Sequence, residues 1–105
     1  MTAEQAHKAA EGLLPDVKLW LRRTGSKLDP EVTQTAAACL LDLQGAGIFN
    51  ISVTDPLIQQ AVKFYAKGHF GYDDHPERWM AAYEHLKSAL SLNSDYTKPA
   101  VIPDG

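Results

Sequence analysis

Residues 55–65 have the sequence Asp-Pro-Leu-Ile-Gln-Gln-Ala-Val-Lys-Phe-Tyr, which contains both the start and the buried face of a helix. Proline suits the first helical turn, which needs no backbone N–H, and the aspartate before it can accept hydrogen bonds from the free amides. The apolar residues that follow recur at helical spacing: Ile58, Ala61, Val62 and Tyr65. Because Leu57 and Phe64 widen this stripe, we predict a central helix that is covered on more than one side.

The same kind of start occurs at Asp29 and again around Pro76, where His75 is the formal cap and Asp74 lies one residue outside. After Asp29, one apolar face is formed by Val32, Ala36, Cys39, Leu40 and Leu43, and Gly45 is a suitable stop. After Pro76, the corresponding stripe is Trp79, Tyr83, Leu86 and Leu90. The sequence therefore predicts three main helices.

The N-terminal part carries weaker signals. Residues 2–11 are rich in alanine and charge, so they favour helix but offer little apolar surface. We expect Gly12 to separate them from a short helix at residues 15–21 that stops near Gly25. Residues 1–12 are therefore predicted to be loosely attached.

Two segments lack helical periodicity. Residues 49–53 alternate apolar and polar side chains and contain β-branched residues, which predicts an extended, β-like loop between the second and third helices of the bundle, those that follow Asp29 and Asp55. After about Asn93 the chain becomes polar and contains two prolines, so we predict an extended tail. The expected organisation is one all-α domain over residues 1–93, a small bundle of about four helices, followed by the tail at residues 94–105.

An isolated strand is unstable in water, and no other segment is an obvious partner for this loop. Unpaired strands and apolar-bearing tails are common recognition elements, although a loop packed on its own domain is the competing interpretation. We therefore predict that the loop and the tail bind partner proteins through Ile48, Phe49, Asn50, Ile51, Val53, Tyr96, Val101 and Ile102.

Composition narrows the functional classes. The 105 residues fit one domain, and the net charge of −3 argues against a dedicated nucleic-acid binder. No apolar stretch approaches the roughly 20 residues needed to cross a bilayer, and the first residues do not form a secretory signal. Cys39, the single cysteine, lies among alanine and leucine residues and is interpreted as a buried apolar residue. We expect no cofactor.

One cluster could hold a metal ion: His69, Asp73, Asp74 and His75, with His85 as a further ligand. These residues match neither the His-Glu-x-x-His pattern nor a calcium loop. The spacing favours a structural linker whose aspartates cap the next helix. We also find no phosphate-binding loop and no nucleophile elbow, so we do not expect an enzyme.

Six aromatic residues allow two interpretations: Phe64, Tyr65, Phe70, Tyr72, Trp79 and Tyr83. They could form a platform for base stacking, or the contact between two helices. Few basic residues are interleaved with them, which favours the helix contact.

The chain resembles one protein family in several stretches. These are residues 55–65, His69 to Asp73, Trp79, Tyr83 and the Leu-Ser-Leu sequence that ends at Leu92. It is similar to the head–tail connector (head-completion or adaptor) proteins of tailed bacteriophages and prophages, over roughly residues 13–96. Residues 20–25 depart from the hydrophobic-then-acidic turn that this family leads us to expect.

The resemblance implies a non-enzymatic subunit of a homo-oligomeric ring. Such a ring binds below the portal protein, extends the DNA channel and offers a docking surface to a tail-side connector or stopper protein. It implies a place at the head–tail joint of the virion after synthesis in the bacterial cytoplasm, with no membrane partner and with DNA only passing through the channel. The alternative is a small DNA-packaging or regulatory protein, similar to a terminase small subunit, for which the basic stretch of residues 18–27 is the candidate contact.

Overall fold

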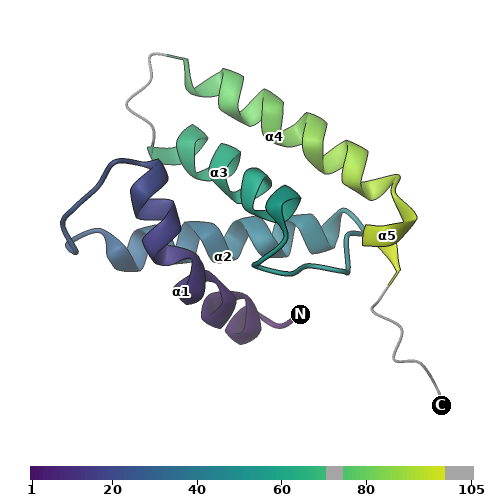
Figure 1. Ribbon diagram of the computed structural model, residues 1–105, viewed down its shortest axis with the longest axis horizontal. Helices are drawn as coiled ribbons and strands as arrows, with labels where there is room; N and C mark the ends of the chain where they lie inside the picture. Colours follow the sequence, from purple (N-terminus) through teal and green to yellow (C-terminus); the bar gives the residue numbers. More distant parts are fainter. Residues whose placement is uncertain (71–74, 99–105) are drawn as a thin grey trace.

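The computed structural model describes residues 1–70 and 75–98 of the chain, and within them every regular element is a helix (Figure 1). The helices are α1 (Ala3–Trp20), α2 (Asp29–Gly45), α3 (Pro56–Phe70), α4 (Pro76–Ser91) and α5 (Ser94–Thr97). The predicted all-α class is confirmed. Among the described residues, no helix is long and apolar enough to span a bilayer.

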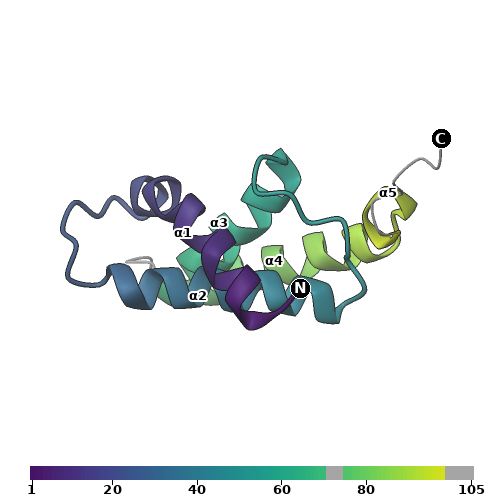
Figure 2. The same cartoon turned by 90° about the horizontal axis from the view of Figure 1, so that it is seen from below.

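The helices pack as two linked pairs. Helix α1 crosses over α2, and α3 and α4 lie side by side in opposite directions (Figures 1 and 2). Helix α3 also packs against α2 and α1, and therefore joins the two pairs, as expected for a central helix. The short helix α5 packs against the end of α4.

The predicted buried faces are largely correct. Every predicted core residue of α2 is buried, and so are Ile58, Ala61 and Val62 of α3. On α4, Tyr83 and Leu90 are buried, whereas Trp79 and Leu86 are only partly covered because α4 packs mainly on α3.

The aromatic residues form the contact between α3 and α4. The ring centroids of Phe64 and Trp79 lie 5.9 Å apart, and Tyr65 meets Tyr83 edge-on at 5.0 Å. The interpretation as a helix contact is supported for these four residues, while Tyr72 lies outside the described residues.

The predicted break at Gly12 is wrong, because α1 is one helix that runs through both Gly12 and Pro15. Thr2 begins it with a reciprocal capping box, in which Gln5 N–H donates to Thr2 Oγ1 at 3.1 Å. A buried stripe follows at helical spacing: Ala6, Ala10, Leu13 and Val17. Packing of this stripe overrides the propensity cost of the glycine and the proline, about 1 and 3 kcal/mol in an isolated helix. The expected loose attachment of residues 1–12 is not seen, since the small alanines bring α1 close to α2.

The aspartates before the prolines do not all act as caps. Asp55 does, because its Oδ1 accepts from Leu57 N–H at 2.8 Å. Asp29 is itself the first residue of α2, and its carboxylate pairs with Lys18 of α1 at 3.0 Å. His75 is the N-cap of α4 as predicted, but its side chain makes no capping hydrogen bond.

The tail also differs from expectation. Residues 94–97 form α5 instead of part of an extended tail, and Asn93 caps this helix by accepting from Asp95 N–H at 2.9 Å. Val101 and Ile102 lie outside the described residues.

Candidate functional site

The predicted partner-binding loop begins where α2 ends, and the geometry of that end decides which loop residues are exposed. Gly47 adopts φ +92°, and its N–H donates to the carbonyl of Gln44 at 2.9 Å. The N–H of Ile48 donates to the carbonyl of Leu43 at 3.1 Å. Together these bonds form a Schellman motif, in which the residue after the left-handed glycine usually packs back onto the helix.

Ile48 is therefore a core residue, and its assignment to a partner surface was wrong. Its side chain has no exposed surface, like that of Leu43 one turn back on α2. The apolar contact that accompanies a Schellman motif explains this burial. The sequence does carry the signal, a glycine followed by an isoleucine just after a helix.

The loop that follows is neither a strand nor unpaired. The N–H groups of Phe49 and Asn50 both donate to the carbonyl oxygen of Tyr96, at 2.8 and 3.0 Å. The Asn50 side chain donates to the carbonyl of Asp95 at 3.0 Å. Within the described residues the two predicted recognition elements, the loop and the start of the tail, thus bind each other.

Further contacts fix the rest of the loop. Gln59 of α3 donates to the carbonyl of Val53 at 2.8 Å, and Val53 is half-buried against the core. Burial, together with the nearby carboxylate of Asp55, raises the pKa of Tyr96. The phenol is therefore neutral over the physiological range and able to donate a hydrogen bond.

An apolar hollow of about 400 Å³ lies beside this contact, lined by Met1, Gln44, Phe49, Ile51 and Thr97. The side chain of Phe49 is 52% exposed, whereas Ile51 is partly buried at the edge of the core. The Oε1 atom of Gln44 is buried without a hydrogen-bond partner in the part of the chain that the structure describes. The hollow therefore offers an exposed aromatic ring beside a partly buried isoleucine.

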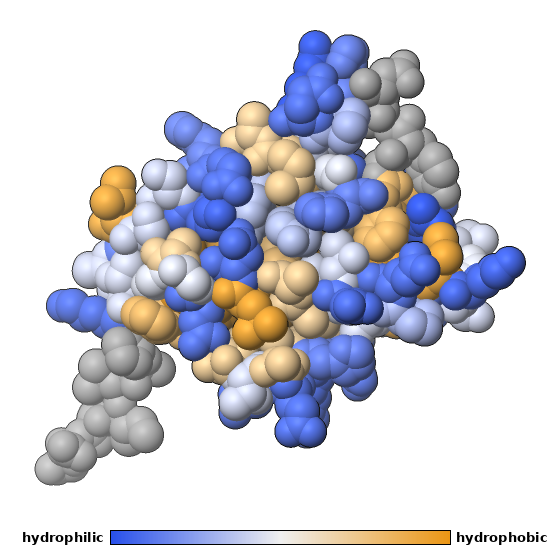
Figure 3. All heavy atoms as spheres, turned by 180° about the vertical axis from the view of Figure 1, so that it is seen from behind, coloured by the Kyte–Doolittle hydropathy of each residue, from blue (hydrophilic) through white to orange (hydrophobic). Residues whose placement is uncertain are grey.

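Other apolar residues are exposed singly. Leu92, the C-cap residue of α4, is 86% exposed, and Leu19 of α1 is 74% exposed, so the two residues belong to different parts of the fold. On the face shown in Figure 3, apolar side chains form separate groups among hydrophilic ones. Scattered exposed leucines are usual on protein surfaces, so the hollow is the better candidate for a binding site.

A second cluster, of polar side chains, links α2 to α4. The hydroxyl of Tyr83 donates to Asp42 Oδ2 at 2.6 Å, and Lys87 Nζ lies 2.9 Å from the same oxygen. Burial of the Asp42 carboxylate opposes ionisation, but the hydrogen bonds from Tyr83 and Lys87 outweigh it and lower the pKa of Asp42. Burial and the neighbouring Cys39 and Asp42 raise the pKa of Tyr83, which stays protonated as the donor.

This cluster is suited to holding helices together. Tyr83 has no exposed surface, so its hydroxyl is inaccessible to a substrate. Burial raises the pKa of the Cys39 thiol to about 12, and a protonated, buried thiol is a poor nucleophile. The prediction that Cys39 is a buried apolar residue is confirmed.

The candidate metal ligands are only partly described, because Asp73 and Asp74 lie outside the described residues. His69 is engaged locally, with Nδ1 2.8 Å from the carbonyl of Tyr65. His75 Nδ1 lies 3.2 Å from a carboxylate oxygen of Glu77. Within residues 1–70 and 75–98, no group of three or more His, Cys, Asp or Glu side chains is placed to hold a metal ion.

Comparison of the chain with protein-family models, with curated proteins and with solved structures finds no match.

Proposed function

We propose that this chain is a non-enzymatic structural subunit of a phage or prophage head–tail connector ring, and that the apolar hollow is one of its docking sites. The proposal is supported by the resemblance of residues 55–65, 69–73 and 79–92 to connector proteins, and by the all-α fold. The observation that carries it is the hollow itself, where Phe49 is 52% exposed beside the partly buried Ile51. An extended segment of another chain would cover the exposed ring of Phe49.

The size of this site predicts weak association at low concentration. Stable interfaces usually bury about 800 Å² on each partner, and a hollow with five lining residues covers only part of that area. The loss of translational and rotational freedom when two chains associate further opposes assembly. Rings should therefore form only when the chain is concentrated or when a portal protein presents many copies together.

Sedimentation velocity tests this proposal on the full chain from low micromolar to near-millimolar concentration, alone and mixed with a phage portal protein. Negative-stain microscopy then shows whether the large species are closed rings. Phe49→Ser should reduce assembly, whereas Leu19→Ser, a matched change of an exposed apolar residue on α1, should not. A chain that stays monomeric under all these conditions would refute the proposal, and so would equal losses for the two variants.

A further inference from the structure

A second Schellman motif ends α1, and it lacks the usual glycine. Arg23 N–H donates to the carbonyl of Lys18 at 2.9 Å, and Arg22 N–H donates to that of Leu19 at 3.1 Å. Arg22 occupies the left-handed position with φ +56°, the one non-glycine residue with positive φ among the described residues. At the end of α2 the same position is held by Gly47.

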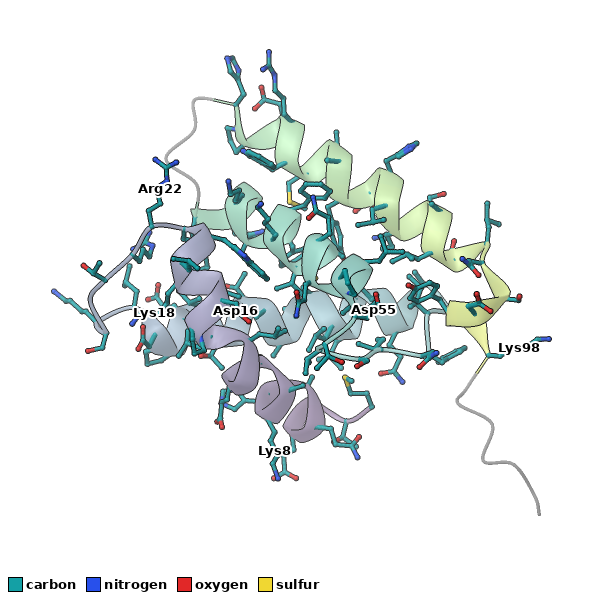
Figure 4. The ribbon with its side chains drawn as sticks, viewed as in Figure 1. Lys8, Asp16, Lys18, Arg22, Asp55 and Lys98 are labelled. Carbon is teal, nitrogen blue, oxygen red and sulfur yellow. The ribbon has the colours of Figure 1, made fainter. Side chains whose placement is uncertain are left out.

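An arginine is costly at this position, because its Cβ crowds the backbone in a conformation that glycine adopts freely. Strained backbone of this kind is often retained where the side chain has a function. The motif also holds Arg22 in a fixed place, exposed and projecting from the end of α1 (Figure 4).

Arg22 lines a cavity of about 360 Å³ with two other basic residues, Arg23 and Lys27. The guanidinium of Arg23 lies 5.6 Å from the centroid of the Phe70 ring, a cation–π distance. Among the described residues, Arg22 and Lys27 have no ion-pair partner.

The first residues of α2 form the opposite wall of this cavity. Asp29 is the one carboxylate among the described lining residues, and Lys18 neutralises it at 3.0 Å. The N-terminal end of α2 adds the positive pole of its helix dipole, which the carboxylates of Asp29 and Glu31 in its first turn partly offset. The cavity is therefore a cationic corner on a chain whose net charge is −3.

We infer that this corner, through Arg22 and Lys27, binds phosphate groups of a double-stranded DNA backbone. Guanidinium and ammonium groups beside a helix N-terminus are the usual chemistry for contacts to phosphate, and they read no sequence. The corner contains few apolar residues and no base-stacking ring, so it suits the backbone of a duplex rather than a single strand. This inference goes beyond the proposed ring, which needs no grip on the DNA that passes through it.

Fluorescence anisotropy of a labelled duplex of mixed sequence, titrated with the full chain over a series of salt concentrations, tests the inference. We expect weak binding that falls as salt rises, with each neutralised phosphate contributing about −0.9 to the slope of log Kobs against log salt. Arg22→Gly should weaken binding at low salt about tenfold and make the slope shallower by about 0.9. Its melting temperature should rise, because glycine relieves the strained position, so lost binding would not reflect unfolding. Arg22→Lys should retain most of the affinity.

Lys98→Gln is the matched control, since Lys98 is an exposed basic residue at the opposite end of the molecule (Figure 4). It should leave the affinity nearly unchanged. Absence of salt-dependent binding would overturn the inference, as would equal losses for Arg22→Gly and Lys98→Gln. Competition by polyglutamate as effective as that by unlabelled DNA would assign the corner to an acidic protein partner instead. Because the assay needs no assembly, it can fail while the ring proposal stands.

Discussion

Truncation of Ile48 to alanine removes three carbon atoms from a side chain with no exposed surface. At about 0.8 kcal/mol for each buried carbon, lost transfer free energy accounts for about 2.4 kcal/mol. The cavity left against α2 adds to this, which brings the expected loss of unfolding free energy to about 3–4 kcal/mol. The neighbouring Phe49 is 52% exposed, so its truncation should cost only about 1 kcal/mol.

Urea denaturation followed by circular dichroism at low protein concentration measures both variants. With a slope of about 1.5 kcal/mol per molar urea, the midpoints of Ile48→Ala and Phe49→Ala should differ by about 2 M. Working at low concentration matters, because Phe49 is also expected to stabilise the assembled state. Equal midpoints, or a larger loss for Phe49→Ala, would show that the Schellman motif does not bury Ile48 and that the described hollow is wrong.

Four other predictions concern the contact of Tyr83 with Asp42, the left-handed positions of Arg22 and Gly47, and the buried Cys39. Tyr83→Phe should lower the unfolding free energy by about 1–2 kcal/mol at neutral pH. The loss caused by Tyr83→Phe should become smaller in urea melts at acid pH. The fold lowers the pKa of Asp42, so the ionised carboxylate stabilises the fold above the ordinary pKa of an aspartate. This contribution is lost as the pH falls through the pKa of Asp42 in the folded state. Arg22→Gly should raise the unfolding free energy by about 0.5–1 kcal/mol in the same melts. Gly47→Ala should lower it by about 1–2 kcal/mol, because alanine is strained at φ +92°. Cys39 should react with a thiol reagent only at the rate of unfolding, so fast modification of the native protein would contradict its burial.

The sequence predicted a helix well where its starting residues, its cap and the spacing of its apolar residues all indicate the same helix. In α3, the proline start, the Asp55 cap and the apolar stripe from Ile58 all point to one helix, and the structure has it at Pro56–Phe70. In α1 the signals conflict. Gly12 and Pro15 disfavour helix locally, but the buried stripe from Ala6 to Val17 gains more by packing on α2 than the two residues cost.

The candidate site was less predictable, for two physical reasons. Both Gly45 and Gly47 could end α2, and only the isoleucine after Gly47 indicates which of the two adopts positive φ. That choice decides whether Ile48 faces the core. The pairing of the loop with Tyr96 joins residues more than forty positions apart in the chain, and neither segment has a periodicity that reveals the other.

Movement of α5 away from the loop would break two hydrogen bonds at once, because both bonds end on the carbonyl oxygen of Tyr96. Because the amides of Phe49 and Asn50 both depend on the carbonyl of Tyr96, they should exchange with solvent deuterium in one step, when α5 lifts away, without unfolding of the larger helices. The same opening would free the main-chain donors beside the apolar hollow. A ligand that captures the lifted form of α5 would therefore change the shape of the hollow, and a ligand that fills the hollow with α5 in place would slow that exchange.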